Sequence, residues 1–448
     1  MIPRDLIRAS AIAACCTLPL TSHATNGYFL PGFGVQSMSM GGVGIASGMD
    51  AVSAAANPAN LSRVGHRFDL DITLFNPQRT AHVYDNPASP VVNPFFGTAL
   101  GPVESGQEAY LMPNIGYSTA LNDKIDLGVA FVANGGMNTT YRKNFFNLGT
   151  HASAVAPGTD TVLGIDLMQL LIPLTTSFKV NETQTIGASL TGAVQRFEAR
   201  GLEEFGTFGI TSDANSLTNK GKDWSYGAGI RLGWIGDFAD KRVSVGATWA
   251  SKTYMTKFDR YKGLFAEQGD FDIPSNYGLG LSLRPNDHLT VALDVTRTLY
   301  SGIKSVSNRG PDKVTIQAFA PGPCPADPQC LGNDDGMGFG WTDQTVYKIG
   351  VSYQLNDDLA LRAGYNYGKS PIPDDQFTFN TLAPATVEKH YSVGFNYKRK
   401  KGPEISGVFM VVPNNRMEGC GFQLIDCASI EMKQRYLGVN IAWDMDKK

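Results

Sequence analysis

The chain has 448 residues, with 38 basic and 41 acidic side chains, a net charge of −3 and a mean hydropathy of −0.14. This balance gives no basic footprint for nucleic acid. No long apolar run follows the first 24 residues, so a helical membrane protein is excluded. No composition break could serve as a linker, which indicates one large unit.

Residues 1–24 have the features of a secretory signal peptide. Arg4 and Arg8 precede an apolar run at residues 11–20, and Ser22-His23-Ala24 is a small-x-small cleavage site. A lipoprotein processing box at residues 12–15 is the alternative, and it would put a lipidated cysteine at the mature end. The cleavage site lies where a signal peptide should end, so we expect residues 1–24 to be removed on export.

Residues 41–59, GGVGIASGMDAVSAAANPA, are rich in small side chains and carry one charge, on Asp50. The segment ends with Asn57-Pro58-Ala59. Because proline fixes φ and biases the preceding residue away from the helical region, this triplet has one defined geometry. A flexible glycine-rich linker is the alternative. We favour a compact segment that packs closely against other backbone.

From residue 67 onward, apolar residues alternate with small or polar ones at period two. A soluble sandwich also alternates. Tyr and Trp at the strand ends of the apolar face, with Gly, Ser, Thr and Asn on the other face, favour a transmembrane β-barrel. The pattern predicts fourteen strands, at residues 67–78, 107–121, 124–135, 171–181, 183–197, 222–236, 241–256, 270–285, 287–300, 341–356, 358–369, 388–400, 402–413 and 430–443.

The connections between these strands alternate between tight turns and long loops. Asn122-Asp123 is one of the turns. Short periplasmic turns and long external loops are typical of bacterial outer-membrane barrels, which have an even number of strands and leave no unpaired edge in lipid. We therefore predict an all-β fold, a 14-stranded antiparallel barrel over residues 63–443, with a tail at 444–448. The long loops are predicted at 79–106, 136–170, 198–221, 257–269, 301–340, 370–387 and 414–429; within the second, residues 161–173 fit either a short helix or the start of a strand.

The four cysteines after the leader form two close pairs, Cys324 with Cys330 and Cys420 with Cys427. In an exported chain they predict two local disulfides, each within a long loop. Zinc is the alternative, but no histidine lies near either pair.

No catalytic motif is present. Ser189 lies in mid-strand, where the sharp turn of a nucleophile elbow cannot form. Asn333-Asp334-Asp335-Gly336 lacks the distal carboxylate of a calcium loop. We expect no catalysis, no metal and no cofactor.

The tract Gly42-Val43-Gly44-Ile45-Ala46, followed by Asn57-Pro58-Ala59 near the mature N-terminus, resembles the hatch of the outer-membrane long-chain fatty acid transporters, the FadL-like proteins. The resemblance implies a monomeric barrel of the bacterial outer membrane, surrounded by its lipid and lipopolysaccharide and plugged by residues 25–62. It also implies that external loops capture a fatty acid or an aromatic hydrocarbon, which leaves sideways through the barrel wall. Gly42, Gly44, Asn57, Pro58 and Ala59 are then hatch or gating residues. The usual C-terminal aromatic of the family is displaced here, because five residues follow Trp443.

Asn134, Gly135 and Gly136 end the third predicted strand, and paired glycines mark a bulge, a bend or the close approach of another backbone. The resembled family kinks its third strand inward at a gap in the wall, so we expect the wall opening here; an ordinary strand end is the alternative. A fatty-acid carboxylate also needs a cation, and Arg231 has room beside Gly229 and Gly233, although a lumenal salt bridge from Arg231 to Asp294 or Asp126 is the alternative. A general porin and an adhesive barrel stay open as other functions. The substrate-binding candidates are Phe29, Phe33, Met38, Met40, Arg231, Lys348 and Arg362.

Overall fold

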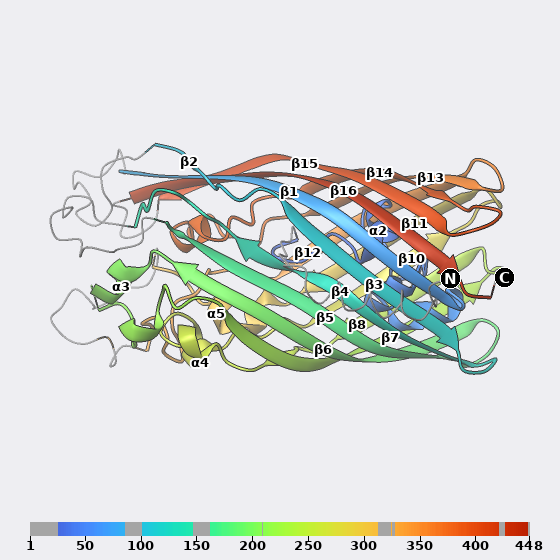
Figure 1. Cartoon of the computed structure of the whole chain (residues 1–448), viewed down its shortest axis with the longest axis horizontal. Helices are drawn as coiled ribbons and strands as arrows, with labels where there is room; N and C mark the ends of the chain where they lie inside the picture. The colour runs from blue at the N-terminus through green and yellow to red at the C-terminus, as the bar shows by residue number, and fades with distance from the viewer. Residues whose placement is uncertain are drawn as a thin grey trace, which may run out of the picture.

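The computed structural model describes residues 26–85, 101–146, 162–207, 209–311, 324, 328–420 and 426–446. The expected signal peptide and the last two residues of the tail lie outside these ranges. Each long strand pairs antiparallel with the next along the chain, and the last strand pairs with the first over 19 residue pairs, so the sheet closes into a barrel (Figure 1). This confirms the predicted 14-stranded antiparallel barrel.

The described residues contain fourteen long strands and two short ones. The short strands, β2 (Val103–Glu104) and β9 (Tyr254–Met255), pair with β1 and β7. The long strands are β1 (Arg67–Asp85), β3 (Tyr110–Ala120), β4 (Ile125–Asn138), β5 (Gly164–Lys179), β6 (Gln184–Arg200), β7 (Asp223–Phe238), β8 (Val243–Ala250), β10 (Asn276–Leu283), β11 (Leu289–Thr298), β12 (Gln344–Gln354), β13 (Leu359–Gly368), β14 (Lys389–Tyr397), β15 (Glu404–Cys420) and β16 (Asp426–Asp444).

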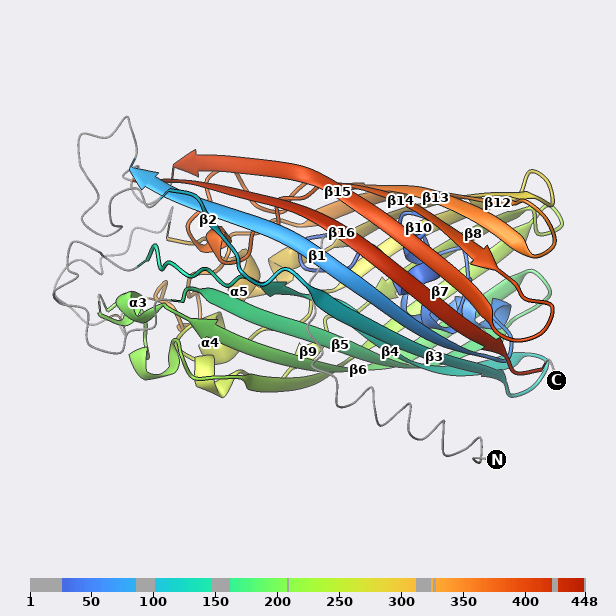
Figure 2. The same ribbon diagram turned by 45° about the horizontal axis from the view of Figure 1, so that its top comes forward.

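Helices are short and lie in the N-terminal segment and the long connections. Figure 2 shows α3 and α4 at one end of the barrel and the tight turns at the other. By the usual sidedness of such barrels, the end with tight turns faces the periplasm. The helices are α2 (Gly34–Met38), η1 (Ala51–Ala55), η2 (Pro58–Arg63), α3 (Glu203–Thr207), η4 (Ala214–Ser216), η5 (Asp259–Tyr261), α4 (Ala266–Gly269), η6 (Tyr300–Gly302), α5 (Lys304–Ser307) and η9 (Phe379–Thr381).

The outer face of the barrel is apolar, as the alternation predicts. Leu190, Leu279 and Leu437 are 58%, 65% and 57% exposed, whereas the residues next to them in each strand are buried on the lumen side. An apolar face of this kind is stable against lipid tails and unstable against water. No helix of the described residues is long and apolar enough to cross a membrane.

Four predicted loops contain strand. β1 continues to Asp85 and β2 lies within the loop predicted at 79–106, and β6 continues to Arg200 within the loop predicted at 198–221. β5 begins at Gly164, so residues 164–170 extend a strand into the loop predicted at 136–170. The loop predicted at 414–429 is wrong in larger part, because β15 continues to Cys420 and β16 begins at Asp426. These strand ends project beyond the apolar band, where an outward face that meets water carries polar residues and loses the apolar alternation that indicates a strand.

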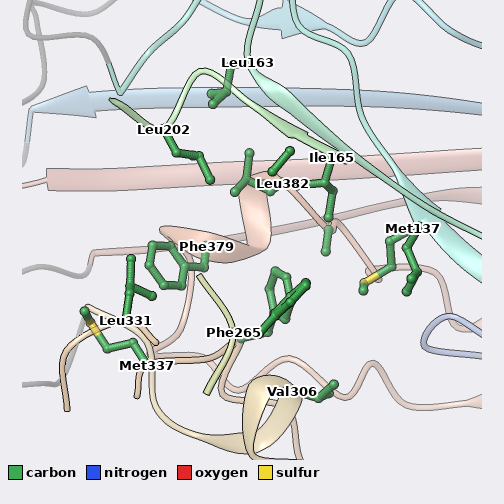
Figure 3. Packing of buried hydrophobic residues seen from close by; sticks show 14 of the residues in the cluster. Met137, Leu163, Ile165, Leu202, Phe265, Val306, Leu331, Met337, Phe379 and Leu382 are labelled. Atoms are coloured by element: carbon green, nitrogen blue, oxygen red, sulfur yellow. The ribbon is translucent and has the colours of Figure 1, made fainter. Parts of the chain in front are cut away.

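The long connections bury their own apolar side chains in one large cluster at the outer end of the barrel. Leu163, Leu202, Phe265, Phe379 and Leu382 of this cluster come from four different connections, with Phe379 and Leu382 in the same one (Figure 3). Loops that share a hydrophobic core stabilise one another, because each apolar side chain is shielded from water only while the side chains of the other loops pack against it.

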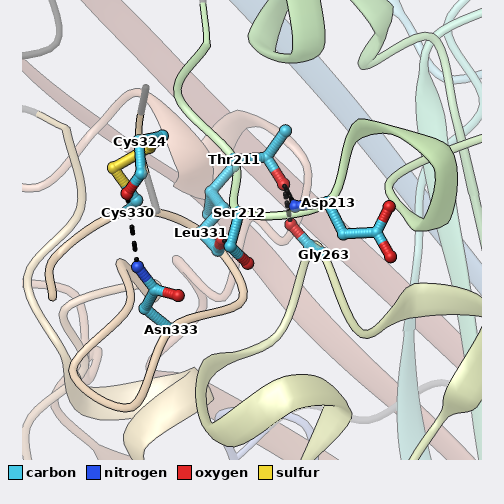
Figure 4. The surroundings of a disulfide bond; sticks show 8 residues. All are labelled: Thr211, Ser212, Asp213, Gly263, Cys324, Cys330, Leu331 and Asn333. Atoms are coloured by element: carbon cyan, nitrogen blue, oxygen red, sulfur yellow. Dashed lines mark hydrogen bonds between the residues drawn. A yellow bond between two sulfur atoms is a disulfide. The ribbon is translucent and has the colours of Figure 1, made fainter. Parts of the chain in front are cut away.

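Both local disulfides are present. Cys324 and Cys330 are joined beside a contact between two loops, where Ser212 N–H donates to the Leu331 carbonyl (2.9 Å; Figure 4). Cys420 and Cys427 face each other across β15 and β16, so this disulfide joins paired strands and does not lie within a long loop.

Candidate functional site

The N-terminal segment lies inside the barrel. Its helix η2 contacts the strands from β4 to β7, η1 contacts β1 and β3 to β5, and α2 contacts β1 and β14 to β16. Residues 26–65 therefore reach strands around most of the lumen. We call these residues the hatch.

Acidic side chains of the wall accept hydrogen bonds from the hatch backbone. Asp71 accepts from Val35 N–H (3.0 Å), and Asp69 accepts from Ala51 N–H (2.9 Å). Most of the hatch lies outside regular helices and strands, so its backbone groups do not all hydrogen-bond to one another. A buried backbone group without a hydrogen-bond partner costs free energy. The wall carboxylates supply those partners.

A second carboxylate site holds the glycine tract of the hatch. Asp294 accepts from Gly44 N–H (2.7 Å) and Ile45 N–H (3.0 Å). Lys348, directly opposite Asp294 in the pairing of β11 with β12, donates through Nζ to the carbonyls of Pro31 (2.8 Å) and Gly42 (3.1 Å). One anion and one cation thus bind complementary backbone groups of the same tract.

Asn57 joins three parts of the molecule. Its side-chain oxygen accepts from Ala59 N–H (3.0 Å), which caps η2, and Pro58 occupies the first helical position. Its Nδ2 donates to the carbonyl of Ile45 (2.8 Å) and reaches the strand carbonyls of Trp234 (3.2 Å) and Ala247 (3.3 Å). The triplet therefore links the two halves of the hatch to β7 and β8.

Glycines on both sides allow this close approach. A Cβ at Gly233 would lie 1.8 Å from Asn57 Oδ1, and one at Gly364 would lie 2.0 Å from the Gly41 nitrogen. Gly42 has φ of +86°, and a Cβ there would lie 2.0 Å from the Pro31 carbonyl oxygen. A larger residue at Gly233 or Gly364 would push the hatch away from the wall, and one at Gly42 would separate two parts of the hatch.

The strand β4 leaves its neighbour β3 partway along its length. The two strands pair from Ala120 opposite Asp126 to Ile115 opposite Phe131, and beyond this Ala133 N–H donates to the Asn114 side chain instead of a strand carbonyl (2.9 Å). All residues from 132 to 138 are buried, so the strand turns into the lumen. The pairing with β5 shifts register between Ala133 and Gly135.

The hatch replaces β3 as the partner of this inward segment. Leu30 N–H donates to the Asn134 carbonyl (3.1 Å), and Gly136 N–H donates to the Tyr28 carbonyl (2.9 Å). Asn134 also donates through its side chain to Gln169 Oε1 on β5 (2.8 Å). The three predicted opening residues therefore lie where the start of the hatch meets the wall.

A cavity of about 110 Å³ lies between the hatch and the wall. Asn134 lines it on one side and Arg231, Asp294 and Lys348 on the others. Its apolar lining is Phe29, Leu30, Phe33, Ile45, Leu171, Ile273 and Val346.

Arg231 is a buried cation beside this cavity. Its Nη1 donates to the Ala56 carbonyl and to Thr248 Oγ1 (both 3.3 Å), and no carboxylate among the described residues pairs with it. Asp126 pairs instead with Lys179 (3.3 Å), and Asp294 holds the hatch. The expected salt bridge from Arg231 to Asp294 or Asp126 is therefore wrong.

Aromatic side chains of the external loops cover the first residues of the hatch. The ring of Tyr28 lies 5.4 Å from that of Tyr300 and 5.8 Å from that of Trp341, and Tyr300 Oη donates to the Asn26 carbonyl (2.8 Å). Burial raises the pKa of Tyr28, so its phenol stays neutral. This roof joins the loops to the same segment that pairs with β4.

A sequence model of the family described as "Outer membrane protein transport protein (OMPP1/FadL/TodX)" matches residues 23–408. The chain belongs to this family. A search of curated proteins finds no match.

Solved structures of the FadL and TodX type share this fold. The P. putida toluene transporter TodX is 19% identical, with a TM-score of 0.66 over 93% of this chain and 100% of that one. A Pseudomonas aeruginosa FadL homologue is 16% identical (TM-score 0.65; 93% and 99% covered), and the Ralstonia pickettii toluene transporter TbuX is 17% identical (TM-score 0.58; 92% and 99% covered). Like its family, the protein is an outer-membrane channel for hydrophobic molecules.

Only some of the predicted substrate-binding residues line the cavity between the hatch and the wall. Phe29, Phe33, Arg231 and Lys348 line the cavity. Met38 and Met40 are not among its lining residues and pack in two separate hydrophobic clusters, and Arg362 donates to Gln36 Oε1 of the hatch (3.0 Å). Sequence reasoning missed the carboxylates of Asp69 and Asp71. The signal that could have found them is a pair of acidic residues that alternates with the apolar residues Phe68, Leu70 and Ile72.

Proposed function

We propose that this protein is a passive channel for long-chain fatty acids and releases them sideways into the bilayer between β3 and β4. The observation that supports this best is the cavity lined by apolar side chains and by Arg231, a cation with no carboxylate partner among the described residues. A fatty acid combines an apolar chain with one carboxylate, and burying that carboxylate without a partner costs several kcal/mol. Arg231 supplies the missing charge.

The inward turn of β4 supports a sideways exit. A ligand that leaves through the periplasmic end must cross water, and each exposed CH₂ costs about 0.8 kcal/mol, so an acyl chain loses on the order of 10 kcal/mol. A gap between β3 and β4 avoids this cost, because the chain passes from lumen to lipid without meeting water.

The hatch is the proposed gate of this path. Tyr28 and Leu30 bind the inward segment of β4, and the roof of loop aromatics covers Tyr28. Movement of residues 26–30 would open the cavity toward the gap, while Gly42, Gly44 and the triplet Asn57-Pro58-Ala59 keep the rest of the hatch attached to the wall.

The test is a double variant, Gly135→Val with Gly136→Val. Valine favours a straight, fully paired strand, so β4 should close against β3 and uptake of a long-chain fatty acid should fall to background. Gly192→Val on β6 is the control, since the nearest atom to a Cβ there is 3.9 Å away. Both variants should keep heat-modifiable barrel folding and external ligand capture. Normal uptake by the double variant would refute the sideways route.

Neutral aromatic hydrocarbons are the second candidate substrate. TodX and TbuX are described as toluene transporters. The cavity of about 110 Å³ is also near the size of an engineered apolar cavity of roughly 150 Å³ that binds benzene. Arg231→Gln separates the two substrates: it should weaken fatty-acid binding at least tenfold if a carboxylate pairs there, and it should leave toluene uptake unchanged.

A further inference from the structure

Four cationic side chains lie exposed on the outer surface, on or beside three of the four consecutive strands β13 to β16. Lys389 is on β14, Lys433 and Arg435 are on β16, and Lys369 follows the end of β13. We call these four residues the cationic patch.

The cationic patch lies at the upper edge of the apolar band. The register places Tyr391, Val411 and Arg435 in one row across β14, β15 and β16. Tyr391 and Val411 are 49% and 38% exposed, and two residues below Arg435 on the same face Leu437 is 57% exposed. Lys389 and Lys433 each lie two residues further toward the external end, about 7 Å along their strands. Arg435 therefore marks the boundary between lipid tails and headgroups.

No carboxylate among the described residues forms an ion pair with any member of the cationic patch, whereas two cations near the outer ends of other strands are ion-paired. Lys252 pairs with Asp272 (3.4 Å) and Arg297 with Asp343 (3.3 Å).

The nearest carboxylates on β15 and β16 are already bound to other side chains. Glu418 pairs with Arg416 (2.9 Å), and Glu431 accepts from Asn414 (2.8 Å). An amide donor leaves the charge of Glu431 in place, and Glu388 beside Lys389 accepts from Ser370 N–H (3.1 Å). Four cations therefore face two carboxylates, and the cationic patch keeps a net positive charge.

We propose that the cationic patch binds the phosphate groups of a phosphorylated glycolipid in the outer leaflet. The Arg435 guanidinium can bind a phosphate through two parallel N–H bonds, and the lysines add point charges around it. The acyl chains of the same lipid would lie on Tyr391, Val411 and Leu437. Because the apolar and cationic surfaces are continuous, this site favours a membrane lipid over a soluble anion. A soluble anion has no acyl chains, so contact with Tyr391, Val411 and Leu437 adds nothing to its binding free energy.

The experiment uses the full mature barrel in detergent and measures binding of bisphosphorylated lipid A by native mass spectrometry. Lys433→Gln with Arg435→Gln should weaken binding at least tenfold, and Lys369→Gln with Lys389→Gln should weaken it by a smaller factor. The matched control, Lys252→Gln with Arg297→Gln, removes two ion-paired cations and should change binding less than twofold.

A second measurement compares lipid A with its fully dephosphorylated form on the unmodified protein. The phosphorylated lipid should bind at least tenfold more tightly, and added salt should reduce that advantage. Equal affinity for the two lipids, or equal loss in the control variant, would overturn the proposal. The substituted side chains of the cationic patch are exposed and those of the control are half-buried. Heat-modifiable folding is therefore measured for every variant, and only variants that fold as the unmodified protein does are compared.

Discussion

Substitution of Asn57 by alanine should loosen the hatch without unfolding the barrel. Asn57 is fully buried, caps η2 through the Ala59 N–H and is the hydrogen-bond partner of the Ile45 carbonyl. Asn57 also contacts the carbonyls of Trp234 and Ala247. These two residues pair with each other between β7 and β8, and this pairing does not depend on Asn57. The loss is therefore confined to the contact of the hatch with itself and with the wall.

The magnitude follows from these contacts. Loss of an N-cap costs about 1 kcal/mol, and a buried carbonyl left without a donor costs about 1–3 kcal/mol. The total of about 2–4 kcal/mol corresponds to roughly a 30-fold to 700-fold larger population of the undocked hatch, at about 1.4 kcal/mol per factor of ten.

Hydrogen exchange of the hatch amides measures this population directly. The amides of Ser53, Ala56 and Asn60, which are hydrogen-bonded within η1 and η2, should exchange faster in Asn57→Ala by that factor. Amides of the barrel strands should be unchanged. Ser62→Ala is the control, since it removes two half-buried bonds, to the Ala59 carbonyl (3.1 Å) and to Thr185 Oγ1 (3.4 Å), and should have a much smaller effect. An increase below threefold in Asn57→Ala would refute the role of Asn57 in docking. Unchanged fatty-acid uptake at normal surface levels would separately remove its role in gating.

Two further predictions concern the wall and the loops. Gly364→Val should displace the hatch, because its Cβ would lie 2.0 Å from the Gly41 nitrogen; proteolysis of the hatch in the folded barrel measures this, and unchanged protection would contradict it. Each disulfide closes a loop of only six or seven residues, so reduction should destabilise its own loop by at most about 2 kcal/mol and leave the heat-modifiable transition of the barrel unchanged. Mass spectrometry of the unreduced protein should find only these two local pairs.

The sequence predicts the barrel well because the wall obeys a local rule. Each strand must alternate between lipid and lumen, so the pattern is visible in every segment on its own. The prediction is wrong where that rule stops applying, as in the outer part of β15, where Asn414, Arg416 and Glu418 face water and read as a loop.

The site is harder to predict, because its residues meet only after closure. The Asn57 triplet and the glycines of β4 have local signals in turn chemistry and backbone freedom. The partners of Arg231 have no such local signal. Alternation alone makes Asp294 a plausible partner of Arg231, and only the strand register shows that Asp294 lies opposite Lys348. The cavity needs residues from the hatch and from strands between β4 and β12, and no sequence window contains that combination.

The use of charge in the lumen separates a plugged channel from a general porin. A porin lumen needs charges that face water, since they set which solutes pass. Here Asp69, Asp71 and Asp294 accept hydrogen bonds from hatch N–H groups, and Lys348 donates to hatch carbonyls. These charges hold backbone in place, and the wall glycines allow that backbone to approach. Arg231 differs from them, because it gives the hatch a single 3.3 Å bond and lies beside the cavity without a carboxylate partner among the described residues. A lumen arranged in this way favours one amphipathic ligand at a time over a stream of hydrated solutes.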